Sequence, residues 1–545
     1  MNVQKILSRY QQLKSARDGA WLAVWRDVRR YVYPQYSDYL PEGGTRGEEI
    51  FDSSAITCRA RLAAGMYSWM LDPTKRLIEL MPADEFLDDD DDVKEYFAAL
   101  TRAVISLMAN SNWQTVTIQM LNSIAAGLVG VVFAEDPGAD SPVNLKSFPI
   151  ESICYSENSR GVVDTVFRET EMTAEQIVEE FDEKTVPEII RDEAADPKRQ
   201  DKKHRICHAV FPRRKRNADM LDKLNMPYAD IYIEIGLKHL LYEGGFEEFP
   251  YCVCRFEKAD NESYGRGPGL DKLPDIKMLN RMRQSYIIGS EHVNDPDTII
   301  PDGSIDTAAA WNKSPGAVRI YKPDANGAKP EYMIYPANLN QLAKDIAEER
   351  QSLKEAFFLD IFDPLGELKN ITATEAEIRN ESKIVPFAPI VGNVHSDYLA
   401  PMVHRFLGIA GRRGLLPELP ERLLENPSYR INYVSKIALA MKKVEALGWL
   451  QTEAGIGNIV NLNPEVIDNF DTDKIVRDIS RANGINPEWR RREQERDEIR
   501  QTRAQQQAQL QQAEMIAQGA ALAPDLAKAP EPGSPLSAIM NGEQQ

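Results

Sequence analysis

The chain has 545 residues, of which 43% are hydrophobic and 27% are charged, as in ordinary globular proteins. At roughly 150 residues per domain, this length excludes a single small fold, and the composition excludes collagen-like, mucin-like and wholly disordered chains. The 65 Lys and Arg against 84 Asp and Glu give a formal net charge of −19. Because such a field repels polyanions at long range, we do not expect a protein that grips nucleic acid with its whole surface.

The number of cysteines and the length of the apolar runs indicate the cellular compartment in which the protein folds. Five scattered cysteines are too few for a disulfide scaffold, which favours a reducing compartment. The first ten residues lack the uninterrupted apolar run of a secretory signal. The most apolar stretch, Ile124 to Ala134, is about half as long as the roughly twenty residues that a membrane-spanning helix needs. We therefore expect neither export by that route nor a membrane span.

The first 135 residues are expected to be mainly helical. Apolar residues recur at spacings of three and four from Val3 to Val32 and again from Ile56 to Met70, which is typical of helices. The segment from Val93 to Ala134 predicts two more helices, separated near Asn110-Ser111-Asn112 by residues that favour caps and turns.

The sequence pattern changes from helical to strand-like between about Val143 and Cys254. Short runs of β-branched and aromatic residues, such as Val162 to Arg168, alternate with turn signals and predict strands. The clearest hairpin candidate joins Ile231 to Ile235 with Tyr251 to Phe256 across a break at Gly244-Gly245. We therefore predict a mixed α+β region with at least one antiparallel sheet.

A β insert between two helices is predicted next. A long helix is expected from Pro268 until just before Asp295-Pro296, and helical periodicity resumes from Asn338. The proline-rich stretch between them has strand-like pieces at Val318 to Tyr321 and Tyr332 to Tyr335. We expect the two flanking helices to run antiparallel.

The C-terminal third is again mainly helical. Thr372-Ala373-Thr374-Glu375 matches a capping box, so a helix is predicted from Thr372 to about Arg413. Three prolines inside that run must kink or break it. Further helices are predicted at Ala438 to Trp449, Asp473 to Ala482 and Pro487 to Gln518, and a disordered tail from Gly519.

The usual catalytic motifs are missing from the sequence. No G-x-x-x-x-G-K-[ST] stretch exists, which excludes a P-loop motor. The glycine-rich run from Gly265 to Gly269 has the wrong spacing for a dinucleotide site and favours a tight turn. G-x-S-x-G is absent, and none of the six histidines stands in a family signature, so a triad would need distant parts of the chain. We predict no catalytic residue and no cofactor site.

Two clusters could hold a metal ion. Cys252 and Cys254 could converge with the group at His204, Cys207 and His208, although structural cysteines are the favoured interpretation. The acidic run Asp88 to Asp92 lacks the glycine turn and distal glutamate of a calcium loop, and a solvated loop is favoured. We predict no metal site.

A basic segment from Lys198 to Arg216 has two open interpretations. Its Lys and Arg residues could contact phosphates, because such contacts release condensed counterions. A solvated hairpin, or a salt-bridged surface facing another subunit, is an equal alternative. The absence of recognisable chemistry in so long a chain favours a component of an assembly.

Several blocks, in order along roughly residues 20 to 440, resemble podovirus-type head-to-tail connector, or portal, proteins. They are Arg26–Pro34, Ile50–Ala55, Leu62–Met66, Asp72-Pro73, Phe249–Tyr251, Arg255, Tyr264–Pro268, Leu273–Lys277, Leu279-Asn280, Thr372–Glu375 and Tyr433–Ser435.

The resemblance implies an α+β, mainly α fold that assembles as a ring, usually of twelve subunits. It also implies a division into wing, stem, clip, channel loop and crown. The implied parts are 1–267 wing, 268–294 first stem helix, 295–337 clip, 338–358 second stem helix, 359–371 channel loop, 372–437 kinked helix and rest of the wing, 438–518 crown or barrel helices and 519–545 tail.

The implied role is mechanical and involves no enzyme activity. Double-stranded DNA would pass through the ring at a unique capsid vertex during packaging and ejection. Partners would be a separate ATP-driven terminase, tail adaptor proteins, and capsid and scaffolding proteins. The protein would be assembled in the host cytoplasm and become part of the virion.

An acidic lumen with few cations would let DNA slide, because each phosphate-binding cation adds affinity. The candidate DNA-facing cations near the implied channel loop are Lys354, Lys369, Arg379 and Lys383. They could instead be exposed helix charges or intersubunit pairs. The alternatives for the whole chain are a helical virion scaffold or adaptor without a conduit, and a metal-dependent nucleic-acid enzyme built on Asp88 to Asp92 or on the cysteine and histidine cluster.

Overall fold

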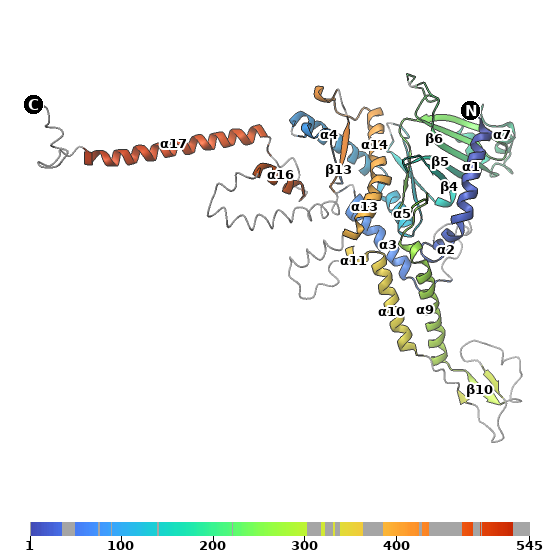
Figure 1. Cartoon of the computed structure of the whole chain (residues 1–545). Coiled ribbons are helices and arrows are strands. Elements are labelled where there is room, and N and C mark those ends of the chain that lie inside the picture. Colours follow the sequence, from blue (N-terminus) through green and yellow to red (C-terminus); the bar gives the residue numbers. More distant parts are fainter. Residues whose placement is uncertain are drawn as a thin grey trace, which may run out of the picture. The chain divides into compact units, whose positions relative to one another are not determined.

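The computed structural model describes residues 2–34, 49–72, 74, 77–88, 90–138, 141–217, 219–220, 222–301, 318–321, 331–332, 338–362, 385–424, 428–434, 471–482, 491 and 493–526. The chain forms two compact units, Met1–Asn461 and Leu462–Gln545. The first unit holds the sheets, the N-terminal helices and a helix pair that extends from the body (Figure 1). The structure is a mixture of helices and strands, as the sequence predicts.

The predicted N-terminal helices are confirmed, and each contains a π-helical turn. α1 (Val3–Arg17), η1 (Asp18–Leu22) and α2 (Ala23–Tyr31) follow one another without a break. In the same way α3 (Ser54–Met66) continues into η2 (Tyr67–Leu71). A π turn inserts one residue into the helical ladder and is often found at functional sites.

Two more helices follow a short strand. After β1 (Ile78–Pro82) and the 3-10 turn η3 (Glu85–Leu87) come α4 (Asp91–Ala109) and α5 (Trp113–Ala125). Asp90 caps α4 by accepting hydrogen bonds from the backbone N of Asp92 and Val93, at 3.1 and 3.2 Å. These two helices confirm the pair predicted in this part of the sequence.

The second of these helices ends earlier than predicted, because residues up to Ala134 were assigned to it. The chain turns at Gly127, whose φ of +86° favours glycine, and continues as strand β2 (Gly130–Glu135). β2 lies between β3 (Asn144–Phe148) and β9 (Tyr251–Cys254) in a three-stranded antiparallel sheet. A strand buried on both faces is a continuous apolar run, which cannot be told from a buried helix by periodicity.

A five-stranded antiparallel sheet has the order β4-β5-β6-β7-β8. α1 covers one of its faces, where it packs on Cys207 and Ala209, and α6 and α7 cover the other, where they pack on Ile206. Alternate residues of β6 therefore serve two separate cores. The elements are β4 (Ile153–Glu157), β5 (Val163–Thr173), α6 (Ala174–Glu180), α7 (Glu188–Ala195), β6 (Lys203–Pro212), β7 (Tyr228–Glu234) and β8 (His239–Phe246).

The predicted hairpin partner is wrong. β7 pairs with β8, and Gly244 and Gly245 lie inside β8 rather than in a turn. The turn is at Lys238, which has a φ of 53°, and β9 joins the other sheet. A side chain on Gly245 would collide with the backbone O of Lys223 at 2.5 Å. These glycines therefore mark a close approach of another segment, which the sequence pattern does not distinguish from a turn.

The predicted β insert between two helices is confirmed. α8 (Pro268–Asp271) leads into α9 (Leu273–Asn294), and the chain returns along α10 (Leu339–Ala356). Between α9 and α10, β10 pairs in parallel with β11 and antiparallel with β12. The strands are β10 (Thr298–Pro301), β11 (Val318–Tyr321) and β12 (Glu331–Tyr332).

The kinked helix predicted up to Arg413 is divided at its prolines. η6 (Val385–Phe387), α13 (Ala388–Val394), η7 (His395–Leu399) and α14 (Ala400–Arg412) follow in succession, with η7 a π-helical turn before Pro401. Such a turn is one way in which a helix accommodates a proline. After the 3-10 turn η8 (Glu421–Leu423), β13 (Tyr429–Tyr433) returns to pair with β1.

One large core joins the N-terminal helices, the three-stranded sheet, the base of the helix pair and the α13–α14 segment. Trp113 belongs to this core and is 1% exposed. Its ring stacks on Tyr398, with centroids 5.2 Å apart, and its Nε1 donates to the backbone O of Leu71 at 2.9 Å. Segments far apart in sequence thus share one interior.

The second unit contains α16 (Thr472–Ala482) and α17 (Glu493–Leu526). Arg500 donates to both carboxylate oxygens of Asp473 at 2.7 Å and so joins the two helices. α17 continues through the predicted start of the tail at Gly519, so that boundary was placed too early. The helix predicted at Ala438 to Trp449 and the capping box at Thr372 lie outside the described residues.

Candidate functional site

The helix pair is the clearest candidate for a functional element. α9 and α10 are antiparallel: Gly289 near the end of α9 lies beside Leu339 at the start of α10, while Asn280 and Arg350 both bind the segment at Asp52. The chain thus leaves the body along α9, forms the β insert, and returns along α10 (Figure 1).

Asp52 clamps the base of the pair. Its carboxylate, 2% exposed, accepts from Nε and Nη2 of Arg350 at 3.0 and 2.7 Å and from the backbone N of Ser54 at 2.9 Å. Oδ1 of Asn280 accepts from the backbone N of Phe51 and of Asp52 at 2.7 and 3.1 Å. The segment before α3 therefore holds both helices in one arrangement.

Further contacts fix the base of the pair to the body. Lys277 of α9 donates to Asp27 of α2 at 2.6 Å. Beyond α10, Phe362 of α11 (Leu359–Phe362) lies against Gly65 of α3, where an added Cβ would be 2.5 Å from the ring Cγ. The stretch expected to begin the channel loop therefore starts as a short helix.

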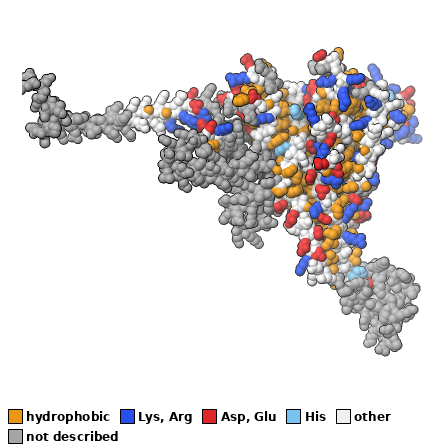
Figure 2. All heavy atoms as spheres, in the orientation of Figure 1, with side chains coloured by type: hydrophobic (Ala, Val, Ile, Leu, Met, Phe, Trp, Pro, Cys, Tyr) orange, Lys and Arg blue, Asp and Glu red, His pale blue; other side chains and the backbone are white. Residues whose placement is uncertain are grey.

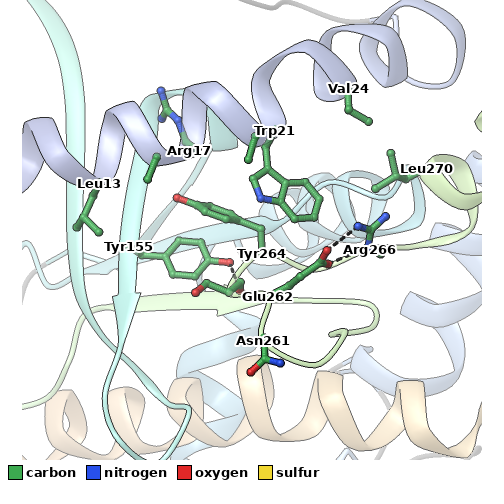
Figure 3. A pocket seen from close by; sticks show the side chains of 13 residues that line it. Leu13, Arg17, Trp21, Val24, Tyr155, Asn261, Glu262, Tyr264, Arg266 and Leu270 are labelled. Atoms are coloured by element: carbon green, nitrogen blue, oxygen red, sulfur yellow. Dashed lines mark hydrogen bonds and ion pairs between the residues drawn. The ribbon is translucent and has the colours of Figure 1, made fainter.

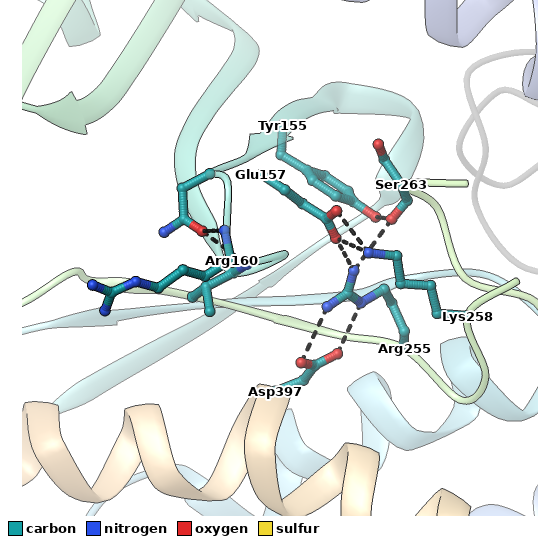
Figure 4. Close-up of polar contacts among 9 residues, drawn as sticks. Tyr155, Glu157, Arg160, Arg255, Lys258, Ser263 and Asp397 are labelled. Carbon is teal, nitrogen blue, oxygen red and sulfur yellow. Dashed lines mark hydrogen bonds and ion pairs between the residues drawn. The ribbon is translucent and has the colours of Figure 1, made fainter. Parts of the chain in front are cut away.

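A buried arginine joins the sheets to the π turn η7 (Figure 4). Arg255 follows β9 and is 6% exposed. Its Nε and Nη2 donate to the two carboxylate oxygens of Asp397 at 2.8 and 3.1 Å, and its Nη1 donates to Glu157 of β4. Lys258 adds a second cation to Glu157, at 2.7 Å. A bidentate, buried pair of this kind fixes orientation as well as position.

The structure describes one of the four predicted DNA-facing cations. Lys354 is exposed in the last turn of α10, next to the junction with the body. Lys369, Arg379 and Lys383 lie outside the described residues. Their place at a channel stays a prediction.

Acidic neighbours within the same chain neutralise much of the basic segment. Lys202 pairs with Glu193, Arg205 with Glu169, Lys203 with Glu171 and Arg199 with Asp196, while the buried Arg213 donates to the backbone O of Gly244 at 2.8 Å. These pairs lie within one subunit, so phosphate contact and a salt-bridged surface facing another subunit both stay predictions. Figure 2 likewise shows acidic and basic side chains interspersed over the visible face.

The cysteine and histidine cluster is divided between two sheets. Cys252 and Cys254 lie on β9, whereas His208 lies on β6 with both ring nitrogens engaged, by Tyr251 Oη at 2.7 Å and Asp230 at 2.8 Å. Burial raises the pKa of the Cys207 thiol to about 12, so that it stays protonated. Among the described residues no group of three or more His, Cys, Asp or Glu is arranged to hold a metal ion.

The acidic run is not the solvated loop that was predicted. Asp88 pairs with Arg430 and Asp90 with Arg422, and each aspartate side chain is 12% exposed. The arginines come from more than three hundred residues further along the chain. The sequence gives no sign of that pairing.

A hollow of about 460 Å³ opens between the first helices and the loop before α8 (Figure 3). Trp21 of η1 points toward Tyr264, with ring centroids 5.9 Å apart, and Tyr155 lies beyond it. The guanidinium of Arg266 lies over the Trp21 ring at 5.2 Å and pairs with Glu262 at 2.6 Å. The hollow thus has an aromatic wall and a charged rim.

No helix in the described part of the chain combines the length and the apolar character needed to cross a bilayer. The elements instead define a mixed helix and strand protein with an anchored helix pair that carries a β insert.

A family model described as bacteriophage head to tail connecting protein matches residues 3–489. The chain therefore belongs to the bacteriophage head-to-tail connecting protein family, which confirms the resemblance. It is 26% identical over 532 residues to a probable portal protein of Bordetella phage BPP-1, across 94% of this chain and 93% of that protein. It is 27% identical over 532 residues to a portal protein of Salmonella phage epsilon15, across 95% and 94%.

A solved structure from the virion of a native gene transfer agent particle is also similar. It covers 79% of this chain and 94% of its own, at 11% identity and a TM-score of 0.35. This similarity is too low to support an argument about function.

Proposed function

We propose that the chain is a bacteriophage portal protein, the head-to-tail connector at the unique vertex of the capsid. Copies form a ring, with twelve as the expected number, and double-stranded DNA passes through it during packaging and ejection. The terminase, the tail adaptor proteins, and the capsid and scaffolding proteins are its partners. The ring assembles in the host cytoplasm and becomes part of the virion.

The observation that carries the proposal is the anchored helix pair with its β insert, in a chain that belongs to the head-to-tail connecting protein family. In the portal, α9 and α10 are the stem and the insert between them is the clip. The body is the wing, and the helices of the second unit belong to the crown. The clamp at Asp52 holds each stem at a fixed angle to the wing, which a ring of identical stems requires.

The mechanism is mechanical. The family is structural, and the conduit only needs a wall with sparse cations, because each cation that binds a phosphate adds sequence-independent affinity. The formal charge of −19 for each chain suits such a wall. Lys354 and the three further candidate cations are the residues that we assign to transient DNA contact.

A helical virion scaffold or adaptor without a conduit is the second candidate. α17 favours it, because from residue 497 to 513 every residue is exposed. An exposed helix of that length without an apolar face of its own gains stability from a partner.

Negative-stain microscopy of the purified chain separates the two candidates. The portal proposal requires closed rings with a central hole near the width of duplex DNA. Monomers, filaments or solid particles would contradict it and favour the scaffold.

A further inference from the structure

We propose that Phe86 of one subunit inserts into the hollow beside Trp21 of the next subunit and so links neighbouring copies around the ring. The inference rests on the proposed function, because it assumes that copies of this chain meet side by side. It adds the residues that make the contact.

Phe86 is an unusual surface residue. It lies in the 3-10 turn η3 and is 95% exposed, the highest value among the exposed large hydrophobic side chains of the described residues. The turn is firmly held, because Asp84 accepts from the backbone N of Phe86 at 3.0 Å and Asp88 pairs with Arg430. An exposed phenyl ring on a held turn can be buried by a partner without rearrangement of the turn, and removing its apolar area from water is favourable.

The hollow provides a matching receptor. Trp21, Tyr264 and Tyr155 form a continuous aromatic series, with centroid separations of 5.9 and 4.6 Å, and an added phenyl ring would find edge-to-face partners. The cavity of about 460 Å³ exceeds the volume of one benzyl group. Figure 3 shows Leu13 and Val24 at its helical side, which supply aliphatic contacts.

Charge complementarity selects a second copy as the occupant. The stretch from 84 to 92 contains seven acidic residues and no basic one. The helices that border the hollow, from Val3 to Tyr31, contain seven basic residues against two acidic ones. Pairs within the chain reduce both charges without reversing either sign: Lys14, Arg29 and Arg30 pair with glutamates, and Asp88 and Asp90 pair with arginines. Opposite fields of this kind orient partners before contact.

The two surfaces lie on opposite sides of the body. The pairs of Asp88 with Arg430 and of Asp90 with Arg422 place the Phe86 turn beside β13. Figure 1 shows β13 and α4 on one side of the body, and α1 and α2 on the other. Two different, complementary patches on opposite sides give a head-to-tail contact, which closes into a ring when the rotation between copies permits.

The test uses the full chain with thiols at both surfaces. Ala83, three residues before Phe86, is exposed, and Ala20 is exposed and lines the hollow. The double variant Ala83→Cys/Ala20→Cys therefore carries one thiol on each side of the contact and keeps Phe86. All five native cysteines are buried, which protects them from a short bismaleimide reagent. The reagent also avoids the strict geometry of a disulfide.

We expect the double variant to give a ladder of covalent oligomers on a denaturing gel, up to the size of the ring. Each single variant, and the control pair Leu224→Cys/Ala20→Cys, should give none, although Leu224 is 52% exposed. Phe86→Ala should keep its melting temperature and raise the concentration needed for half-maximal ring assembly by about tenfold or more.

The outcomes separate this inference from the proposed function. Rings of the unmodified chain, together with an uncross-linked double variant or an unchanged assembly concentration for Phe86→Ala, overturn the inference and leave the portal proposal intact. Capture of the Ala20→Cys thiol only by another virion protein also overturns it. Absence of rings in the unmodified chain overturns the portal proposal and this contact with it.

Discussion

At the scale of single residues, Asp52 contacts two helices that lie more than two hundred residues further along the sequence. It accepts from Arg350 of α10, while its own backbone N donates to Asn280 of α9. Nothing in the spacing of these residues indicates the contact. Ile50 to Ala55 is one of the blocks that resemble portal proteins, but the role of the aspartate becomes visible only in the structure.

Replacing Asp52 by Asn should loosen the base of the helix pair. The amide keeps the shape of the side chain and removes the charge that binds Arg350. We expect the free energy of unfolding to fall by about 1–2 kcal/mol. The loss is no larger because Arg350 is partly exposed to solvent. Denaturant unfolding measures the loss. The control is Glu348→Gln on the exposed side of α10, which should change stability by less than about 0.5 kcal/mol; equal effects of both would contradict the clamp.

The contribution of Asp52 should depend on pH in a defined direction. Burial disfavours the charged form, but the hydrogen bonds from Ser54 and the charge of Arg350 outweigh it and lower the pKa of the carboxyl below its ordinary value. Such a group stabilises above its unfolded pKa and loses its contribution as the pH falls through the folded pKa. The stability difference between the unmodified chain and Asp52→Asn should stay constant from about pH 7 to 5 and shrink below about pH 4. If the stability difference between the two chains grew as the pH falls, the pKa of Asp52 would be raised rather than lowered, and this prediction would be refuted.

Gly65 tests the packing of α11 on α3. The Cβ of Gly65→Ala would lie 2.5 Å from the ring of Phe362, so we expect a loss of about 1–3 kcal/mol from overpacking. Gly392→Ala in α13 is the matched control, because no atom lies within 4 Å of its Cβ. That variant should be neutral or more stable by up to about 1 kcal/mol. A lower melting temperature for Gly392→Ala than for Gly65→Ala would contradict the packing described.

At the scale of elements, α4 shows how a motif can be misread. The five aspartates from Asp88 to Asp92 look like a solvated loop or a cation site in the sequence. In the structure, Asp90 is the N-cap of α4, Asp91 and Asp92 lie in its first turn, and Asp88 and Asp90 pair with arginines. Composition gives the charge of a segment, and only tertiary contacts give its partners.

Asp90→Ala should therefore destabilise the start of α4 by about 1 kcal/mol, because two backbone N–H groups lose their acceptor. Asp90→Asn keeps an oxygen acceptor and should retain most of the stability. The lost pair with Arg422 adds little, since that arginine is 70% exposed. Thermal unfolding should show a lower melting temperature for Asp90→Ala than for Asp90→Asn. Equal losses of stability in the two variants would argue against the role of Asp90 as the N-cap.

At the scale of the whole molecule, the feature most important for the proposed ring is that the helix pair extends away from the body and is fixed to it at its base (Figure 1). The helix pair meets the body at the Asp52 clamp, at the pair of Lys277 with Asp27 and at the contact of Phe362 with Gly65. In the proposed ring, these contacts give every copy an equivalent stem. The exposed Lys354 lies close to that junction.

Lys354→Glu should leave ring assembly unchanged and alter DNA packaging, because it replaces a candidate phosphate contact by a repulsive charge. Ring formation is measured by microscopy, and packaging by the rate and length of DNA taken up in an assembly reaction. Lys344→Glu, on the same helix and also exposed, is the matched control. Normal packaging by the Lys354 variant would remove this residue from the proposed channel.

The sequence by itself determined the helices with long periodic apolar faces, the antiparallel sheet region and the β insert between two helices, because these patterns are local. It also carried the family resemblance, as the ordered blocks show. Local pattern failed at β2 and at Gly244-Gly245, where burial on both faces and close approach decide the structure.

Only the tertiary structure decided how these elements meet. It paired Asp88 and Asp90 with distant arginines, joined both long helices at Asp52, and placed Trp21 against Tyr264. Each of these contacts joins residues more than two hundred positions apart. Their physical basis is packing and charge pairing in space, which a one-dimensional pattern of hydrophobicity and charge does not encode.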